Sequence, residues 1–226
     1  MTKVSAADIS KLRELTGAGM MDCKKALEES NGDTEAAQDW LRKKGIAKAA
    51  KREDREAKEG VVIAKTNADQ TRAVVLALNC ETDFAARNEG FIALTNKFVD
   101  IALENFPATL EALLALPFEG SVTIGEKVGE QVGVIGEKIE IGRYEPITGA
   151  QILIYNHSNN KRSVAVALNK SDAEFEQAGR DVAMQIAAMS PVSVSRDDVD
   201  PKIIEKEIEI GKELARNEGK AEDMLE

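Results

Sequence analysis

The segment with the clearest potential for chemistry is residues 79–88, which read Asn-Cys-Glu-Thr-Asp-Phe-Ala-Ala-Arg-Asn. It follows an apolar run at residues 74–78 whose aliphatic and β-branched content predicts a buried strand. Thr82 and Asp83 are residue types that cap helices, so we expect a strand-to-helix turn with Phe84 in or beside the first helical turn. Taken alone, a phenylalanine at that place is expected to pack into the core of its own domain. The alternative is that Phe84 is displayed for binding.

A second segment, residues 16–27, has a glycine-rich turn followed by a helix-forming stretch, Thr-Gly-Ala-Gly-Met-Met-Asp-Cys-Lys-Lys-Ala-Leu. Taken alone, its Lys24 is interpreted as a solvated lysine, and the pair Met20 and Met21 as core and turn packing. From the residues alone this segment predicts a helix start and not a reaction centre.

Residues suited to bond-making chemistry are scarce. His157 is the single histidine, and Cys23 and Cys80 do not have the spacing of metal ligands. The Gly-Lys pairs at residues 211–212 and 219–220 lack the upstream glycine and the hydroxyl group of a phosphate-binding loop. We therefore expect the protein not to be an enzyme and to have no cofactor and no metal site.

The composition favours a protein partner. The chain has 226 residues, of which 43% are hydrophobic and 31% charged, enough to build a core. A net charge of −10 argues against nucleic acid, which is bound by clustered lysine and arginine. No apolar stretch approaches the roughly 20 residues that span a bilayer, and the first residues lack the apolar core of a signal peptide. We expect a cytoplasmic protein that binds neither nucleic acid nor membrane.

The first part of the chain predicts three short helices. Apolar residues recur at helical spacing before residue 16, from about residue 20 to 30, and again after Asp33, with Gly45 expected to end the third helix. Helices of this length with short loops predict a bundle of the ubiquitin-associated type over residues 1–45. Residues 46–59 are rich in both charges and are interpreted as a solvated linker, either irregular or partly helical.

The rest of the chain contains an internal repeat. Residues 72–79 and 162–169 share Arg, Val, Ala, Leu and Asn in register, and each run is part of a hairpin-then-helix unit. We expect an α+β fold with two related lobes, residues 60–145 and 146–200, followed by a helix at residues 201–226. Between the copies we expect a loop at residues 120–130 and a strand at 132–141. The second copy lacks Thr-Asp-Phe, which favours a functional role for Phe84 over a packing role.

The two segments together resemble the signatures of the elongation factor Ts family, in the family's order, and the resemblance extends over essentially the whole chain. It implies a guanine-nucleotide exchange factor of translation that binds elongation factor Tu in its GDP-bound and nucleotide-free states. In that family the Thr-Asp-Phe loop meets the GTPase domain of elongation factor Tu and disturbs the Mg²⁺ site of the nucleotide. Carried over, Thr82 begins the loop, Asp83 is the polar anchor and Phe84 the wedge. Ala85 replaces the family's usual valine, which removes apolar contact beside the wedge.

The resemblance also implies further contacts with elongation factor Tu at Lys24, Ile135, Gly136 and His157. Family members continue into a coiled-coil hairpin, a strand that closes the second lobe and a final helix, so the resemblance implies that the second lobe, residues 146–200, is incomplete here. We therefore expect residues 201–226 to begin that coiled coil, in a chain that is either truncated or a short form. The sequence leaves open whether the protein is a homodimer. The competing hypothesis is a protein-binding module with a ubiquitin-associated-like domain and no exchange activity.

Overall fold

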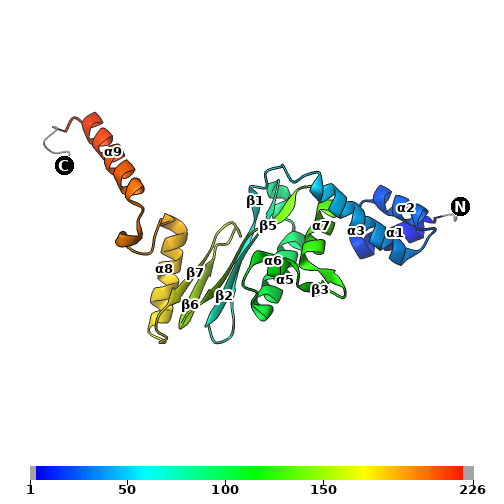
Figure 1. The fold of residues 1–226 in the computed structure, drawn as a ribbon, viewed down its shortest axis with the longest axis horizontal. Helices are drawn as coiled ribbons and strands as arrows, with labels where there is room; N and C mark the ends of the chain where they lie inside the picture. The colour runs from blue at the N-terminus through cyan, green and yellow to red at the C-terminus, as the bar shows by residue number, and fades with distance from the viewer. Residues whose placement is uncertain (1–3, 221–226) are drawn as a thin grey trace. The chain divides into compact units, whose positions relative to one another are not determined.

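The structure, a computed structural model, describes residues 4–220 (Figure 1). It combines helices and antiparallel strands, which confirms the expected mixture of α and β elements. The chain forms two compact units, and the boundary between them falls between Ala187 and Ala188. Within residues 4–220, every helix is too short or too polar to cross a membrane.

Three helices form the N-terminal bundle: α1 (Ala6–Thr16), α2 (Met20–Glu29) and α3 (Thr34–Ala50). Ser5 and Asp8 form a capping box at the start of α1, and Gly17 ends the helix in the left-handed conformation at φ 68°. The buried residues of the bundle are Leu12, Ala18, Cys23, Ala26, Leu27 and Ala37.

Helix α3 is longer than predicted, because Gly45 does not end it and the helix continues to Ala50. The first part of the expected linker is therefore helical. Gly45 has a packing role instead: α3 crosses α7 (Ile124–Ile135) so closely that a β-carbon at residue 45 would lie 2.8 Å from the carbonyl oxygen of Gly129. Gly133 lies at the same crossing. Glycine allows this approach of two backbones at the cost of helix propensity.

The prediction of a loop at residues 120–130 and a strand at 132–141 was wrong. Thr123 and Glu126 form a capping box that starts α7, and Gly136 ends the helix at φ 81°. Ile124, Val128 and Val132 are buried along one side at helical spacing. Two glycines within this stretch, Gly129 and Gly133, face α3. The strand β5 (Ile139–Thr148) begins only after the turn.

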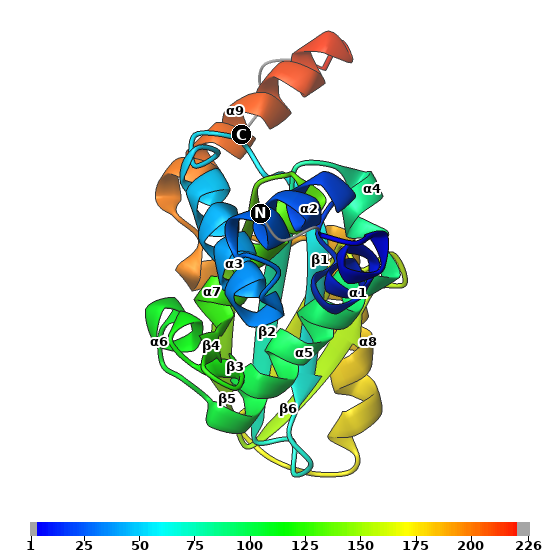
Figure 2. The same ribbon diagram turned by 90° about the vertical axis from the view of Figure 1, so that its right-hand side faces the viewer.

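The central sheet has the antiparallel order β1-β2-β5, with β1 at Glu59–Thr66 and β2 at Arg72–Cys80. Alternate residues of β2 are buried, and α5 (Glu89–Asn105) covers this sheet, as Figure 2 shows. The short helices α4 (Asp83–Ala86) and α6 (Leu110–Leu114) flank α5 in sequence. A small hairpin of β3 (Pro117–Glu119) and β4 (Val122–Thr123) precedes α7.

The second copy of the repeat is a separate hairpin of β6 (Gln151–Asn156) and β7 (Ser163–Leu168), followed by α8 (Phe175–Met189). It is attached to the outer edge of β1 by side-chain hydrogen bonds. The amide nitrogen of Asn156 donates to the Ala64 carbonyl at 2.9 Å, and its Oδ1 accepts from the Ala64 N–H at 2.8 Å. The predicted hairpin-then-helix unit therefore occurs in both copies.

The second unit contains a 3₁₀ turn at Arg196–Asp198 and the helix α9 (Pro201–Asn217), whose first turn is capped by Asp200. The apolar residues of α9 are exposed: Ile203, Ile204, Ile208, Ile210 and Leu214. Residues 221–226, the end of the expected coiled-coil start, lie outside the described residues.

Candidate functional site

The predicted turn after β2 is confirmed as a strand-to-helix turn. Thr82 is the N-cap of α4, and its Oγ1 accepts a hydrogen bond from the Ala85 N–H at 3.4 Å. Asn88 then caps α5 through its Oδ1, which accepts from the Gly90 N–H at 2.8 Å. Two caps within seven residues explain why a four-residue helix forms here before the chain turns again.

Phe84 is exposed, with 84% of its surface accessible, so it is displayed and does not pack into the core of its own domain. The residues that follow it fill that role instead, since Ala85 and Ala86 are 8% and 6% exposed. Asp83 lies beside Phe84 on the same turn and forms an ion pair with Arg87 at 2.9 Å. An exposed phenylalanine next to an accessible carboxylate can bind a protein surface through apolar and polar contacts together.

A hollow beside Phe84 is formed by α4, α5 and the end of α7. Ile135, the last residue of α7, lines it together with Phe84 and Ala85, and Gly136 caps the helix next to it. The structure therefore brings together Phe84 and Ile135, two parts of the candidate site that are about fifty residues apart in the sequence.

Sequence reasoning missed Glu137, which holds the turn. Its carboxylate accepts hydrogen bonds from the N–H groups of Glu81 and Thr82, at 3.0 and 2.9 Å, and from the Thr82 hydroxyl at 2.6 Å. The only signal in the sequence was its position directly after Gly136. We did not recognise Glu137 as the residue after a helix end, because we expected a strand at residues 132–141.

The second segment, residues 16–27, lies on the other side of the end of α7. A β-carbon at Gly17 would lie 3.4 Å from Val134, and Val134 also lines the hollow beside Phe84. Met20 and Met21 are 59% and 73% exposed, so the expectation that they pack in the core was wrong. Lys24 is exposed too, with only a long contact of 3.8 Å to Glu28.

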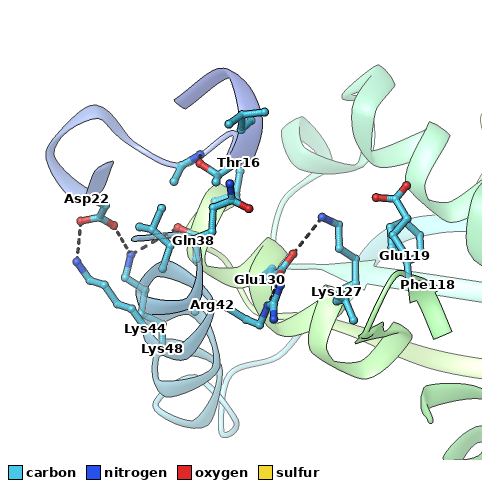
Figure 3. Close-up of a pocket in the computed structure, with 17 residues that line it drawn as sticks. Thr16, Asp22, Gln38, Arg42, Lys44, Lys48, Phe118, Glu119, Lys127 and Glu130 are labelled. Atoms are coloured by element: carbon cyan, nitrogen blue, oxygen red, sulfur yellow. Dashed lines mark hydrogen bonds and ion pairs between the residues drawn. The ribbon is translucent and has the colours of Figure 1, made fainter. Parts of the chain in front are cut away.

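A pocket of about 240 Å³ is lined by residues of the bundle, of α7 and of the β3–β4 hairpin (Figure 3). Most of its charged groups are paired with one another. Asp22 binds Lys44 at 2.7 Å and Lys48 at 3.0 Å, and these contacts hold the pKa of the Asp22 carboxyl below its usual value. On the opposite wall Glu130 binds Arg42 at 2.8 Å. The pocket is therefore a polar joint between bundle and core.

His157 lies in the turn between β6 and β7, and its Nδ1 is 2.8 Å from the Tyr155 hydroxyl. The neighbouring Lys161 forms an ion pair with Glu59 at 2.7 Å, and Glu59 is paired with Cys80 across β1 and β2. The hairpin turn is thus at the end of the sheet where the Thr82 turn begins, while the contacts of the His157 ring remain within the hairpin.

The two cysteines are free, and both are buried. Burial and the nearby charge of Glu137 raise the pKa of the Cys80 thiol to about 11, and burial raises the pKa of Cys23. Both thiols are therefore protonated at neutral pH and are poor nucleophiles. Residues 4–220 contain no group of three metal-ligating side chains of the His, Cys, Asp and Glu types.

Comparison with known proteins identifies the family. The sequence model of the family described as "Elongation factor TS" matches residues 81–226. The chain is 48% identical to elongation factor Ts of Christiangramia forsetii and 50% identical to that of Flavobacterium psychrophilum, in each case over 100% of this chain and 81% of the relative. It is 49% identical to elongation factor Ts of Porphyromonas gingivalis over 99% of this chain and 80% of the relative. The chain therefore belongs to the elongation factor Ts family.

Proposed function

We propose that this protein binds elongation factor Tu carrying GDP and promotes the release of GDP and its exchange for GTP. The observation that carries the proposal is the exposure of Phe84, 84% accessible on a capped turn of an otherwise well-packed core. An isolated aromatic side chain gains roughly 1.5–3 kcal/mol when it becomes fully buried. That gain is available only when a partner covers it.

The mechanism we propose is coupling between two binding equilibria, without bond-making by this chain. Phe84 inserts into the GTPase, anchored by Asp83, and disturbs the Mg²⁺ site of the nucleotide. Binding to the nucleotide-free form is then tighter than to the GDP form, and linkage makes the weakening of GDP reciprocal. The protein acts in the cytoplasm, where translation takes place, and needs no nucleic acid, membrane or cofactor.

Phe84 alone does not supply the required energy. A release rate raised by about three powers of ten requires about 4 kcal/mol of interaction specific to the open state. We propose that Ile135 and Gly136 contribute next to the wedge, since Ile135 lines the same hollow. Lys24, with the exposed Met20 and Met21, contributes affinity from the bundle, and His157 contributes from the second lobe.

We assign these contributions to the proposed domains as follows. Residues 1–45, of the ubiquitin-associated-like type, add affinity, and residues 46–59 connect them to the core. Residues 60–145 carry the wedge, residues 146–200 form the second lobe, and residues 201–226 begin the coiled coil.

The test is the release of a fluorescent GDP analogue from elongation factor Tu, measured against increasing concentrations of this chain. We expect strong acceleration that saturates, and Phe84→Ala should lower the maximal rate by about 10- to 100-fold, the equivalent of one buried phenylalanine. The matched control is Phe175→Ala, which removes a 38% exposed phenylalanine at the start of α8 and should leave the rate within about twofold.

Two results would contradict the proposal. Binding to elongation factor Tu without faster release would favour a passive protein-binding module. An equal loss of rate in Phe84→Ala and Phe175→Ala would show that the exposed turn has no special part.

A further inference from the structure

The orientation of Phe84 must come from the backbone beneath it, since its side chain is largely free of packing. Helix α4 has four residues, and so short a helix does not hold its own conformation in water. The direction in which Phe84 points therefore depends on what fixes the start of the turn, at Glu81 and Thr82.

Glu137 fixes both of them from the other side of the site. One carboxylate oxygen accepts the two consecutive backbone N–H groups of Glu81 and Thr82, and the other accepts the Thr82 hydroxyl. Because the hydroxyl proton is engaged by Glu137, a lone pair of Oγ1 is left for the Ala85 N–H, which is the cap of α4. Hydrogen bonds to a charged carboxylate are stronger than neutral ones.

The contact is reciprocal, because Glu81 in turn fixes the segment that carries Glu137. The Glu81 carboxylate accepts the N–H of Lys138 at 2.5 Å. It also binds Arg52 and Arg55, each at 3.0 Å, from the segment between α3 and β1. The Lys138 N–H and these guanidinium groups hold the pKa of Glu81 below its usual value, so the Glu81 carboxylate is ionised at neutral pH.

We propose that Glu137 is the positioning residue of the exchange loop: it sets the direction of Phe84 through Glu81 and Thr82 without itself supplying the wedge. The inference rests on the proposed exchange function and names the residue that makes the wedge effective. It predicts that Glu137 matters for the maximal rate of GDP release only while Phe84 is present.

A double-mutant cycle tests this with the full chain and elongation factor Tu loaded with a fluorescent GDP analogue. Glu137→Ala should lower the maximal release rate about tenfold, and Glu137→Gln should restore most of it, since an amide oxygen still accepts the two N–H groups. When Phe84 is already alanine, adding Glu137→Ala should change the residual rate less than about twofold.

Glu126→Ala is the matched control at the opposite end of α7, where the Glu126 carboxylate accepts the Thr123 N–H at 2.8 Å. It removes a comparable carboxylate-to-backbone contact and should leave the maximal rate unchanged. Amide hydrogen exchange gives a readout that does not depend on elongation factor Tu. Glu137→Ala should expose the amides of Glu81 and Thr82, whereas Glu126→Ala should not.

The outcomes separate this inference from the proposed function. If the unaltered chain fails to accelerate release, the exchange function and the role of Glu137 in it are both wrong. If the chain and Phe84 behave as proposed but Glu137→Ala retains the full rate, only the positioning role is wrong. The positioning role is also wrong if Glu137→Ala lowers the maximal release rate equally with and without Phe84, or if Glu137→Gln does not restore the rate. Either result would indicate general damage to the fold.

Discussion

Gly45 of α3 and Gly129 of α7 are in backbone contact, since a β-carbon at residue 45 would lie 2.8 Å from the Gly129 carbonyl oxygen. The N-terminal bundle is thereby packed on the helix whose far end, at Ile135 and Gly136, lies beside Phe84. Ion pairs from Arg42 to Glu130 and from Arg52 to Glu81 support the same joint. The bundle and the wedge are thus connected through α7.

Gly45→Ala should destabilise this joint. The added methyl group meets a backbone oxygen, which does not move as easily as a side chain, so we expect a loss of about 1–3 kcal/mol in the free energy of unfolding. Gly211→Ala is the control, because the α9 glycine has open space around it and alanine favours the helix by up to about 1 kcal/mol. Urea unfolding followed by circular dichroism measures both variants. A stability of Gly45→Ala equal to or above that of the unaltered chain would contradict the close contact.

The sequence predicted the elements whose pattern is local. The capped turn at Thr82, the helix stop at Gly17 and the repeated hairpins all depend on residues within a few positions of one another. The exposure of Phe84 was favoured by the family resemblance and by comparing the two repeat copies, because apolar character by itself predicts burial.

Elements that depend on a distant partner were not predicted. We predicted a loop and a strand over the residues that form α7, and its Gly129 and Gly133 lie where α3 crosses the helix. Glu137 has no local mark, since its partners Glu81 and Thr82 are more than fifty residues away in the chain, at separations of 56 and 55. Long-range contacts of this kind leave no periodic trace in one sequence.

Phe84→Ala should leave folding almost unchanged, within about 0.5 kcal/mol, because the side chain is exposed. Phe98→Ala is the contrast: Phe98 is fully buried in α5, and its loss should cost about 3–5 kcal/mol. Thermal unfolding of the two variants checks the difference. A large loss of stability in Phe84→Ala would mean that the residue is structural and that the candidate site is misplaced.

Lys24→Glu should weaken the affinity for elongation factor Tu and leave the maximal rate of GDP release unchanged. Lys24 is on the bundle and not on the wedge, and a charge at the rim of an interface mainly affects encounter and residence. We expect the concentration for half-maximal release to rise about threefold to tenfold, the equivalent of about 0.7–1.4 kcal/mol.

Lys25→Glu carries the same change of charge at the adjacent exposed position of α2 and is the matched control. Equal shifts in both variants would indicate a general effect of net charge. A lower maximal rate in Lys24→Glu alone would instead place Lys24 in the displacement step.

Alkaline pH should destabilise the fold through Cys80. Its pKa is raised to about 11 in the folded protein, chiefly by burial, against 9.0 for an ordinary thiol. The folded state therefore favours the protonated thiol, and this contribution is complete below pH 9 and is lost as the pH rises through 11. Tyr144, with a pKa raised to about 12 by burial, adds a similar loss at still higher pH.

Comparing the free energy of unfolding of the unaltered chain and Cys80→Ala from pH 8 to 11 isolates the contribution of the Cys80 thiol. The unaltered chain should lose up to about 2–3 kcal/mol more than the variant over that range. Parallel curves would show that the thiol ionises equally well in the folded and unfolded states, which would contradict its burial at the start of the exchange loop.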